Sequence, residues 1–446
     1  MELTNLIPQF GGLIYTIGAF ILALSIIVAI HEYGHYIVGR WCGIYAEVFS
    51  LGFGPVLFSR VDKRGTKWQF ALLPLGGYVK FLGDADAASA KDSAVMEAIP
   101  EDRKRMTMHG APLWARACTV AAGPVFNFIL SFLIFGAILF FRGQPTDPLT
   151  IDQLTDLPPA YEVALQPGDQ ILAINGEPAP ELEGFDAFVR ELPTEQVLDY
   201  RVLRDGAEVT VDGPYPYPPL INGLSPRSAA MDVNLRVGDV ITAVDGQPIH
   251  TFNALREAVA DADGAPLQLD VWRGGEAMEF VLAPKRVDLP QPDGSFETRW
   301  LIGISGGLFF EAATERGGIG QSMAYGVEQT YFIVKSSLSG LYNIITGAIS
   351  SCNLSGPIGI AQTSSAMASQ GAQSFIYFIA VLSTAVGLLN LFPIPVLDGG
   401  HLVFHAYEAV TGKPPSDRAL RVLMGVGLTL LLSLMVFALG NDLFCP

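Results

Sequence analysis

Cysteine is scarce in this 446-residue sequence, which contains only Cys42, Cys118, Cys352 and Cys445. The four residues are far apart, and no two of them have the C-x-x-C spacing that is typical of thiolate metal sites. The sequence therefore supports neither a disulfide framework nor a cysteine-based zinc site.

Charge is also sparse, since charged residues make up 16% of the chain and hydrophobic residues 50%. This composition excludes an ordinary soluble domain. Four apolar runs are each long enough to cross roughly 30 Å of hydrocarbon as a helix. They are Leu13–Ile30, Ala117–Phe141, Phe375–Leu397 and Val422–Leu439. The first run is interpreted as a retained span rather than a signal peptide, because no Lys or Arg precedes it and His31-Glu32 follows it.

Basic residues are few in one long region. Residues 142–320 contain 29 acidic and 12 basic side chains, and the difference of 17 equals the net charge of the whole chain, -17. Residues 40–116 are slightly basic, and Lys413, Arg418 and Arg421 lie between the third and fourth runs. The positive-inside rule then places these two loops in the cytoplasm, with both termini and the acidic region outside. An acidic region of this kind excludes nucleic acid as a partner. A bridge between Cys352 and Cys445 stays open, because both are expected outside.

A phrase repeats inside the acidic region, first at Leu165–Pro178 and again at Leu235–Pro248. Each copy has a Gly-Asp turn, a short apolar strand and an Asn-Gly or Asp-Gly turn, which is the pattern of a compact β-hairpin. Repetition indicates two copies of one domain. The phrase resembles the core of PDZ domains, which bind an extended peptide beside a strand. Peptide C-termini are therefore candidate ligands, although two spacers or filters that bind nothing fit the pattern as well.

Two further segments have recognisable patterns. Apolar residues recur every three or four positions from Val327 to Ala348, which predicts an amphipathic helix lying on the bilayer or on the protein's own spans. Residues 56–81 form two apolar stretches around Asp62–Gly65, which predicts a β-hairpin with glycine hinges. At membrane depth such a hairpin must be sheltered by helices.

The residues that point to chemistry begin with His31, Glu32 and His35. On a helix the two histidines lie one turn apart on the same face, so both imidazoles can reach one zinc ion, and Glu32 is placed to act as a general base. His-Glu-x-x-His also arises by chance. At the edge of an apolar span, however, three ionisable groups are energetically unfavourable unless they bind a metal or form a proton path.

A catalytic zinc needs a third protein ligand. Asp398 is the only acidic residue in the third run and its continuation. Pro393 and Pro395 are expected to unwind the helix before it, and Gly399-Gly400 to let the chain turn. His401 is a rival ligand or a partner of Asp398, and a solvated Asp398 at a helix end is the plain alternative.

Together these motifs resemble the site-2 protease family, in particular its regulator of sigma-E protease branch with tandem PDZ domains. The resemblance covers nearly the whole chain and includes Gly123-Pro-x-x-Asn127, Ser355-Gly-Pro-Ile358 and the segment from Asn390 to Gly399. It implies an intramembrane zinc metalloprotease in which His31, His35 and Asp398 bind Zn²⁺ and Glu32 is the general base and acid.

The resemblance also implies a substrate cleft. Asn390 would hold the substrate backbone, Asn127 would line the same cleft, and Pro393 and Pro395 would contribute to substrate binding. The two asparagines can instead simply bond a neighbouring helix. Residues 56–81 would match the family's membrane re-entrant β-loop. The implied substrates are transmembrane segments of anti-sigma factors, after trimming of their outer domains, and remnant signal peptides, in a bacterial inner membrane with the PDZ domains in the periplasm.

We therefore expect a membrane protein: an α-helical bundle of four transmembrane helices with a membrane re-entrant β-hairpin and two extracytoplasmic PDZ (α+β) domains. The expected segments are 1–41 (first span), 42–112 (hairpin segment), 113–141 (second span), 142–213 and 214–312 (PDZ domains), 313–372 (amphipathic helix and loop), 373–402 (third span) and 403–446 (loop and fourth span).

Three other functions remain as alternatives. An anchored soluble-type zincin would take its third ligand elsewhere, and a PDZ scaffold without catalysis would leave the intramembrane ionisable groups unexplained. A zinc transporter would need more than one polar span, whereas the second and fourth runs contain no ionisable residue.

Overall fold

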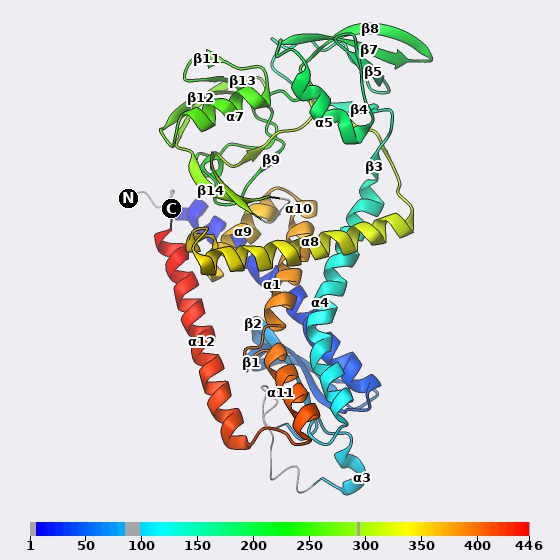
Figure 1. Ribbon diagram of the computed structural model, residues 1–446, viewed down its shortest axis with the longest axis vertical. Helices are drawn as coiled ribbons and strands as arrows, with labels where there is room; N and C mark the ends of the chain where they lie inside the picture. Colours follow the sequence, from blue (N-terminus) through cyan, green and yellow to red (C-terminus); the bar gives the residue numbers. More distant parts are fainter. Residues whose placement is uncertain (1–5, 85–98, 292–294, 446) are drawn as a thin grey trace. The chain divides into compact units, whose positions relative to one another are not determined.

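The computed structural model describes residues 6–84, 99–291 and 295–445, and the chain divides into two compact units. The helical unit comprises Met1–Ala137, Ser322–Tyr342 and Ser351–Cys445, and the β-rich unit comprises Ile138–Gln321 and Asn343–Ser350. Each unit is described separately below, with the element labels of Figure 1.

Four helices of the described residues are long and apolar enough to span a membrane. They are α1 (Leu6–Trp41), α4 (Leu113–Arg142), α10 (Ala372–Asn390) and α12 (Asp417–Phe444). Four spans were predicted, and four helices of suitable length and composition are found. The first apolar run was predicted over Leu13–Ile30 and the first span over residues 1–41, and α1 ends at Trp41. His31 and His35 therefore project from the last third of one continuous helix, whose backbone fixes their relative positions.

The third span breaks where its prolines predict. Helix α10 ends at Asn390, a turn follows, and α11 (Asp398–Thr411) begins at Asp398. Gly399 and Gly400 belong to the first turn of α11, so they do not form a turn as expected. They are required for packing instead, since a Cβ atom at either position would lie 2.3 Å from a backbone oxygen of the preceding segment. This contact holds the start of α11 against the end of α10.

The predicted hairpin is longer and more folded than expected. Strands β1 (Ala46–Val61) and β2 (Lys67–Phe81) are antiparallel, but each bends, so that residues 48–51 of β1 pair with both residues 67–70 and residues 77–80 of β2. Gly52 and Gly54 have φ values of +92° and +85° at the bend in β1, a conformation that favours glycine. Residues 77–81 consequently form an outer segment of the sheet.

The other helices of this unit are α3 (Glu101–Lys104), α8 (Ile319–Thr346), η2 (Ser351–Asn353) and α9 (Pro357–Ser369). Helix α8 is the predicted amphipathic helix. Within the helical unit it lies close to α4, because a Cβ atom on Gly136 of α4 would lie 3.0 Å from the Ser322 carbonyl oxygen. Its remaining apolar side chains are largely exposed.

The C-terminal end of α12 is tied to the start of α9. Cys352 and Cys445 form a disulfide, the bond that the sequence left open. The Asp442 carboxylate accepts hydrogen bonds from the backbone N–H groups of Gly356 and Gly359, both at 2.9 Å, and so caps α9 from another helix. Gly356 has to be glycine, since its Cβ would lie 2.6 Å from Asp442 Oδ2.

The β-rich unit contains two modules of the same design, each with a four-stranded antiparallel sheet and a ten-residue helix, and the second module has a further short helix, α6. The first module has the sheet order β6-β5-β7-β8, and the second has β11-β10-β12-β13. The elements are β3 (Gln144–Pro145), β4 (Ile151–Leu154), β5 (Gln170–Ile174), β6 (Glu177–Pro178), α5 (Leu182–Glu191), β7 (Val197–Arg204), β8 (Ala207–Pro214), β9 (Gly223–Leu224), α6 (Ala229–Asp232), β10 (Val240–Val244), β11 (Gln247–Pro248), α7 (Phe252–Asp261), β12 (Leu267–Arg273), β13 (Glu276–Leu282), β14 (Lys285–Pro290), β15 (Phe296–Leu301), β16 (Ile304–Ser305), β17 (Phe310–Ala312) and β18 (Thr314–Glu315).

The repeated phrase forms the same hairpin in both modules, as predicted. Asn175 and Gly176 have φ values of +53° and +84°, and Asp245 and Gly246 have values of +48° and +75°, which matches the turn that such pairs favour. The two modules are not divided at a single point near residue 213, as the predicted domain boundary implied. Strand β17 pairs with β4, and Phe309 packs in the core of the first module, so the end of the second segment returns to the first.

Candidate metal centre

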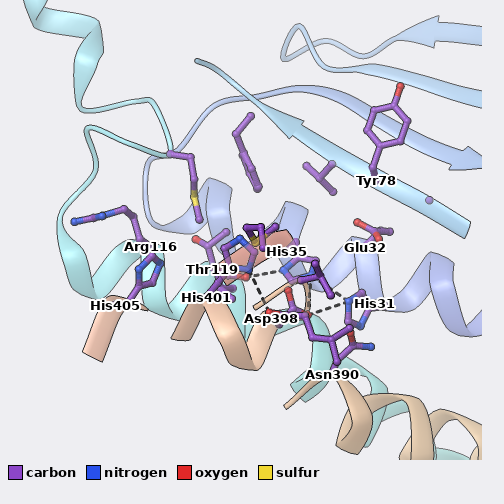
Figure 2. Close-up of a pocket in the computed structure, with 18 of the residues that line it drawn as sticks. His31, Glu32, His35, Tyr78, Arg116, Thr119, Asn390, Asp398, His401 and His405 are labelled. Atoms are coloured by element: carbon purple, nitrogen blue, oxygen red, sulfur yellow. Dashed lines mark hydrogen bonds and ion pairs between the residues drawn. The ribbon is translucent and has the colours of Figure 1, made fainter. Parts of the chain in front are cut away.

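Three side chains from two distant segments meet inside the helical unit. His31 and His35 project from α1, and Asp398 is the first residue of α11 (Figure 2). The two imidazole Nε2 atoms are 3.2 Å apart, and Asp398 Oδ2 lies 3.2 Å from His31 Nε2 and 3.5 Å from His35 Nε2. Among the described residues, this is the single cluster of three His, Cys, Asp or Glu side chains close enough to share a metal ion.

Helix α4 determines which nitrogen of His35 is available. The Nδ1 atom of His35 lies 2.8 Å from the Thr119 carbonyl oxygen, which can only accept a hydrogen bond. Nδ1 therefore carries the proton and donates it, so the lone pair of a neutral ring is on Nε2. A backbone carbonyl often holds a metal-binding histidine in this way.

His31 has a matching partner in Asn127 of α4. Its Nδ1 atom lies 3.2 Å from Asn127 Nδ2, while Asn127 Oδ1 is buried and has no hydrogen-bond partner. Turning the amide by 180° exchanges the two atoms and places an acceptor opposite His31 Nδ1. Oδ1 then accepts the Nδ1–H of His31, and the Nε2 lone pair of this ring also faces the cluster. Asn127 thus contacts a candidate ligand and is absent from the cavity wall described below.

The cluster fits a tetrahedral metal ion. With both Nδ1 atoms protonated, two nitrogen lone pairs face a carboxylate oxygen that is buried and receives no hydrogen bond. Three acceptors this close repel one another unless a cation lies between them. Ligands about 2.0–2.1 Å from a tetrahedral zinc are about 3.3–3.4 Å apart, and the observed separations are 3.2, 3.2 and 3.5 Å.

The wall beside the histidines is a glycine. A Cβ atom at Gly123 of α4 would lie 2.3 Å from His35 Nε2 and 2.8 Å from His31 Cε1. Between the two histidines on α1, a Cβ at Gly34 would lie 2.5 Å from the Ala122 carbonyl oxygen. Helices α1 and α4 therefore approach closely, and the space between the two rings is available only because position 123 has no side chain.

Glu32 points from α1 toward the outer segment of the β1–β2 sheet. Its Cγ would lie 3.1 Å from a Cβ at Gly77, and the Val79 backbone hydrogen-bonds to its carboxylate. Figure 2 shows Glu32 beside His31, on the side of the ring that faces Tyr78. The carboxylate is therefore fixed between the histidines and the edge of the sheet.

A cavity of about 620 Å³ contains the cluster. Asn390 and His401 line it together with His31, Glu32, His35 and Asp398, whereas Pro393 and Pro395 are not part of its wall. His401 is not in the three-residue cluster, and its Nδ1 atom lies 3.2 Å from the Leu397 carbonyl oxygen. Pro395 packs on α12, where a Cβ at Gly427 would lie 3.0 Å from it.

Sequence reasoning missed two contacts. The Thr119 carbonyl gives no signal in the sequence, because any residue has one. Arg116 and Glu408 form a two-pronged ion pair with nitrogen–oxygen distances of 2.7 and 2.9 Å. Arg116 was counted only among the basic residues of a predicted cytoplasmic loop, Glu408 was not singled out, and nothing in their spacing indicated that they pair.

Known proteins resemble the chain over nearly its whole length. The model of the family described as Peptidase family M50 matches residues 19–434. A protein of Agrobacterium fabrum, provisionally named a zinc metalloprotease, is 35% identical over 99% of both chains. The regulator of sigma E protease of Haemophilus influenzae is 32% identical over 96% of this chain and 98% of its own. The regulator of sigma-E protease RseP of Salmonella typhimurium is 32% identical over 97% and 99%.

Proposed function

The chain belongs to peptidase family M50 and is a membrane metallopeptidase, and on this premise we propose that it cleaves transmembrane segments of single-span proteins at a zinc ion held by His31, His35 and Asp398. The observation that supports this proposal best is the convergence of three possible ligand atoms, one each from His31, His35 and Asp398, in one half-buried cluster. The names of the relatives, which include zinc metalloproteases, support zinc as the ion.

The reaction requires a proton acceptor close to the metal. When bound, zinc would polarise the scissile carbonyl and make a water molecule more acidic. Glu32 takes the proton of the attacking water on its carboxylate and passes it to the leaving amine. The Val79 backbone and the missing side chain at Gly77 keep this carboxylate beside His31 during both transfers.

Substrate binding is proposed at the outer segment of the β1–β2 sheet. Peptide bonds in a membrane helix already have their carbonyls hydrogen-bonded, so the substrate must unwind before attack. Residues 77–79 and 81 line the cavity, and an unwound segment could pair beside them as an added strand. Asn390, in the same wall, would hold the substrate backbone. Pro393 and Pro395 would act indirectly, by ending α10 so that Asn390 and Asp398 face one cavity.

The two modules of the β-rich unit are proposed to be PDZ domains on the periplasmic side of a bacterial inner membrane, with both chain termini also outside. They would admit only substrates whose outer domain has been shortened, such as trimmed anti-sigma factors and remnant signal peptides. Peptide C-termini are the ligands that PDZ-type grooves would take. The excess of acidic residues in this region and the basic cytoplasmic loops support this orientation.

The central test is a Glu32→Gln variant of the full chain, assayed with a single-span model substrate. Cleavage should fall by at least about 10²-fold, because general acid–base catalysis contributes about 10²–10⁴-fold. Zinc content should stay at that of the parent, since Glu32 is not a ligand. Undiminished turnover would remove Glu32 from this role.

The filter is tested separately by deleting residues 144–309. The shortened protein should cleave substrates with intact outer domains that the parent refuses. If it still refuses them while cleaving trimmed substrates at the parental rate, the modules are not the filter.

A further inference from the structure

Helix α4 supplies no ligand to the cluster, yet it contacts every element that does. Asn127 faces His31, the Thr119 carbonyl accepts from His35, and Arg116 binds Glu408 of α11. At 100° per residue, positions 116, 119 and 127 lie within about 80° of one another around the helix axis. One face of α4 therefore holds both the helix that carries the histidines and the helix that carries Asp398.

The first two contacts reach the histidines directly, but Asp398 has no such partner. Its Oδ2 atom receives no hydrogen bond, and Gly399 and Gly400 are the only buried residues of α11. Farther along this helix Leu402, Phe404 and His405 are half-buried, whereas Val403 and Val410 are 49% and 87% exposed. Packing is therefore tightest at the beginning of α11 and looser toward its end, where a specific contact can fix the orientation of the helix.

Glu408 fastens the far end of α11. Both of its carboxylate oxygens accept hydrogen bonds from Arg116, at 2.7 and 2.9 Å, and Arg116 Nε donates to the Ala111 carbonyl at 3.1 Å. The two side chains are only 15% and 17% exposed, so solvent screens this pair weakly. A two-pronged guanidinium–carboxylate pair fixes orientation as well as distance.

The contact at Glu408 lies far from Asp398 along α11, so it restrains the orientation of the whole helix. Glu408 lies ten residues after Asp398, which corresponds to about 15 Å along the helix. A helix held at both ends cannot rotate about its axis, whereas a rotation of α11 would carry the Asp398 carboxylate away from the two imidazoles. Arg116 also lies one turn before Thr119, so a single turn of α4 fixes His35 and the far end of α11 together.

We propose that the Arg116–Glu408 ion pair is a positioning contact for the metal centre, which holds α11 so that Asp398 faces His31 and His35. The proposal rests on the proposed zinc site and adds two residues outside the three-residue cluster, of which Arg116 also lines the cavity. It differs from general stabilisation because its loss should weaken the metal site more than the fold.

The test measures zinc affinity by competition with a chelator on the full-length protein, for Arg116→Gln, Arg116→Lys and Glu408→Gln. Partners behind metal ligands typically change affinity by roughly 10–100-fold, and we expect losses in this range for the two Gln variants. Arg116→Lys should lose less, because lysine keeps the charge and lacks the fork. The exchange variant R116E/E408R should recover at least half of the lost affinity on a logarithmic scale.

The matched control is Arg204→Gln, which breaks an equally short two-pronged pair with Asp169 in the first module. It should leave zinc affinity within about twofold of the parent. The proposal is overturned if the Gln variants bind zinc as tightly as the parent, or if the control weakens zinc as much as they do. Should the single variants fail to fold, an exchange variant that folds but does not bind zinc would also overturn it.

The same measurement separates this proposal from the one on which it rests. A parent protein without zinc affinity would contradict the proposed function. A parent that binds zinc, with variants that bind it equally well, contradicts only the positioning role.

Discussion

The two regions of the molecule treat a buried carboxylate in opposite ways. In each module of the β-rich unit, the aspartate of the repeated Gly-Asp turn is about 1% exposed and fully paired. Asp169 accepts two hydrogen bonds from Arg204 and one from the Gln166 N–H, and Asp239 is bound in the same way by Arg273 and the Arg236 N–H. In the helical unit, Asp398 faces two acceptor nitrogens and has no donor on Oδ2.

The difference separates a structural carboxylate from a candidate ligand. A buried charge without donors is strongly unfavourable. Asp169 and Asp239 avoid that penalty with arginines from their own modules, so they hold their turns in place. Asp398 has no arginine or lysine partner among the described residues and faces two imidazoles instead, so its charge is balanced by a metal ion or by a proton on one of those rings.

Replacing the carboxylates should therefore give opposite results, and this is the largest effect we expect. Asp398→Asn should remove nearly all bound zinc and cleavage while the thermal unfolding midpoint changes little. Asp169→Asn should keep zinc and instead increase hydrogen exchange in β5 and β7, because Arg204 loses its charged partner. Metal analysis and hydrogen exchange measured by mass spectrometry check both. If the Asp398→Asn variant retains zinc, Asp398 does not differ from Asp169 in the way described here.

The next largest effect is expected at Gly123. A methyl group there would overlap His35 Nε2, so Gly123→Ala should abolish zinc binding at concentrations that saturate the parent. The control is Gly425→Ala in α12, another helical glycine at the cavity, where an added Cβ meets no atom within 4 Å. Isothermal titration with zinc distinguishes them, and equal behaviour of the two variants would show that the glycine wall is irrelevant.

A smaller effect should separate the two asparagines. Asn127→Leu removes the acceptor for His31 and should weaken zinc binding by roughly 10-fold, whereas Asn127→Asp keeps an acceptor and should bind nearly as the parent does. Asn390→Leu should leave zinc unchanged and raise the KM for a model substrate. If Asn127→Leu raises KM alone, Asn127 has the cleft role first expected for it.

The smallest effect that we expect is a loss of stability of the first module at low pH. Burial by itself would raise the pKa of Asp169, but hydrogen bonds from Arg204 and the Gln166 N–H hold its pKa below the usual value. Its contribution to stability is therefore complete above the unfolded pKa of about 3.9 and is lost as pH falls through the lower folded pKa. Protection of β5 against hydrogen exchange should decline with acidification, and less so in Arg204→Gln. An identical decline in both proteins would contradict this assignment.

The sequence predicted what depends on local pattern. Four apolar runs became four helices, the repeated phrase became two identical hairpins, and His31, His35 and Asp398 lie in one cluster. The sequence did not predict contacts between residues that are far apart in the chain. The pairing of Arg116 with Glu408 depends on how two helices cross, and the folding of β1 and β2 into four segments depends on bends at Gly52 and near Gly76. Asn127 was expected at the substrate cleft because no pattern reveals which neighbour an amide will contact.

The states of the four cysteines can be used to determine how the chain is oriented in the membrane. Cys352 and Cys445 are bonded to each other, whereas Cys118 and Cys42 are free and lie near the opposite ends of the spans. Disulfides persist in oxidising compartments, and free thiols persist in reducing ones. A membrane-impermeant maleimide applied to intact cells should thus leave Cys118 unlabelled, and should label it once the cytoplasmic face is opened.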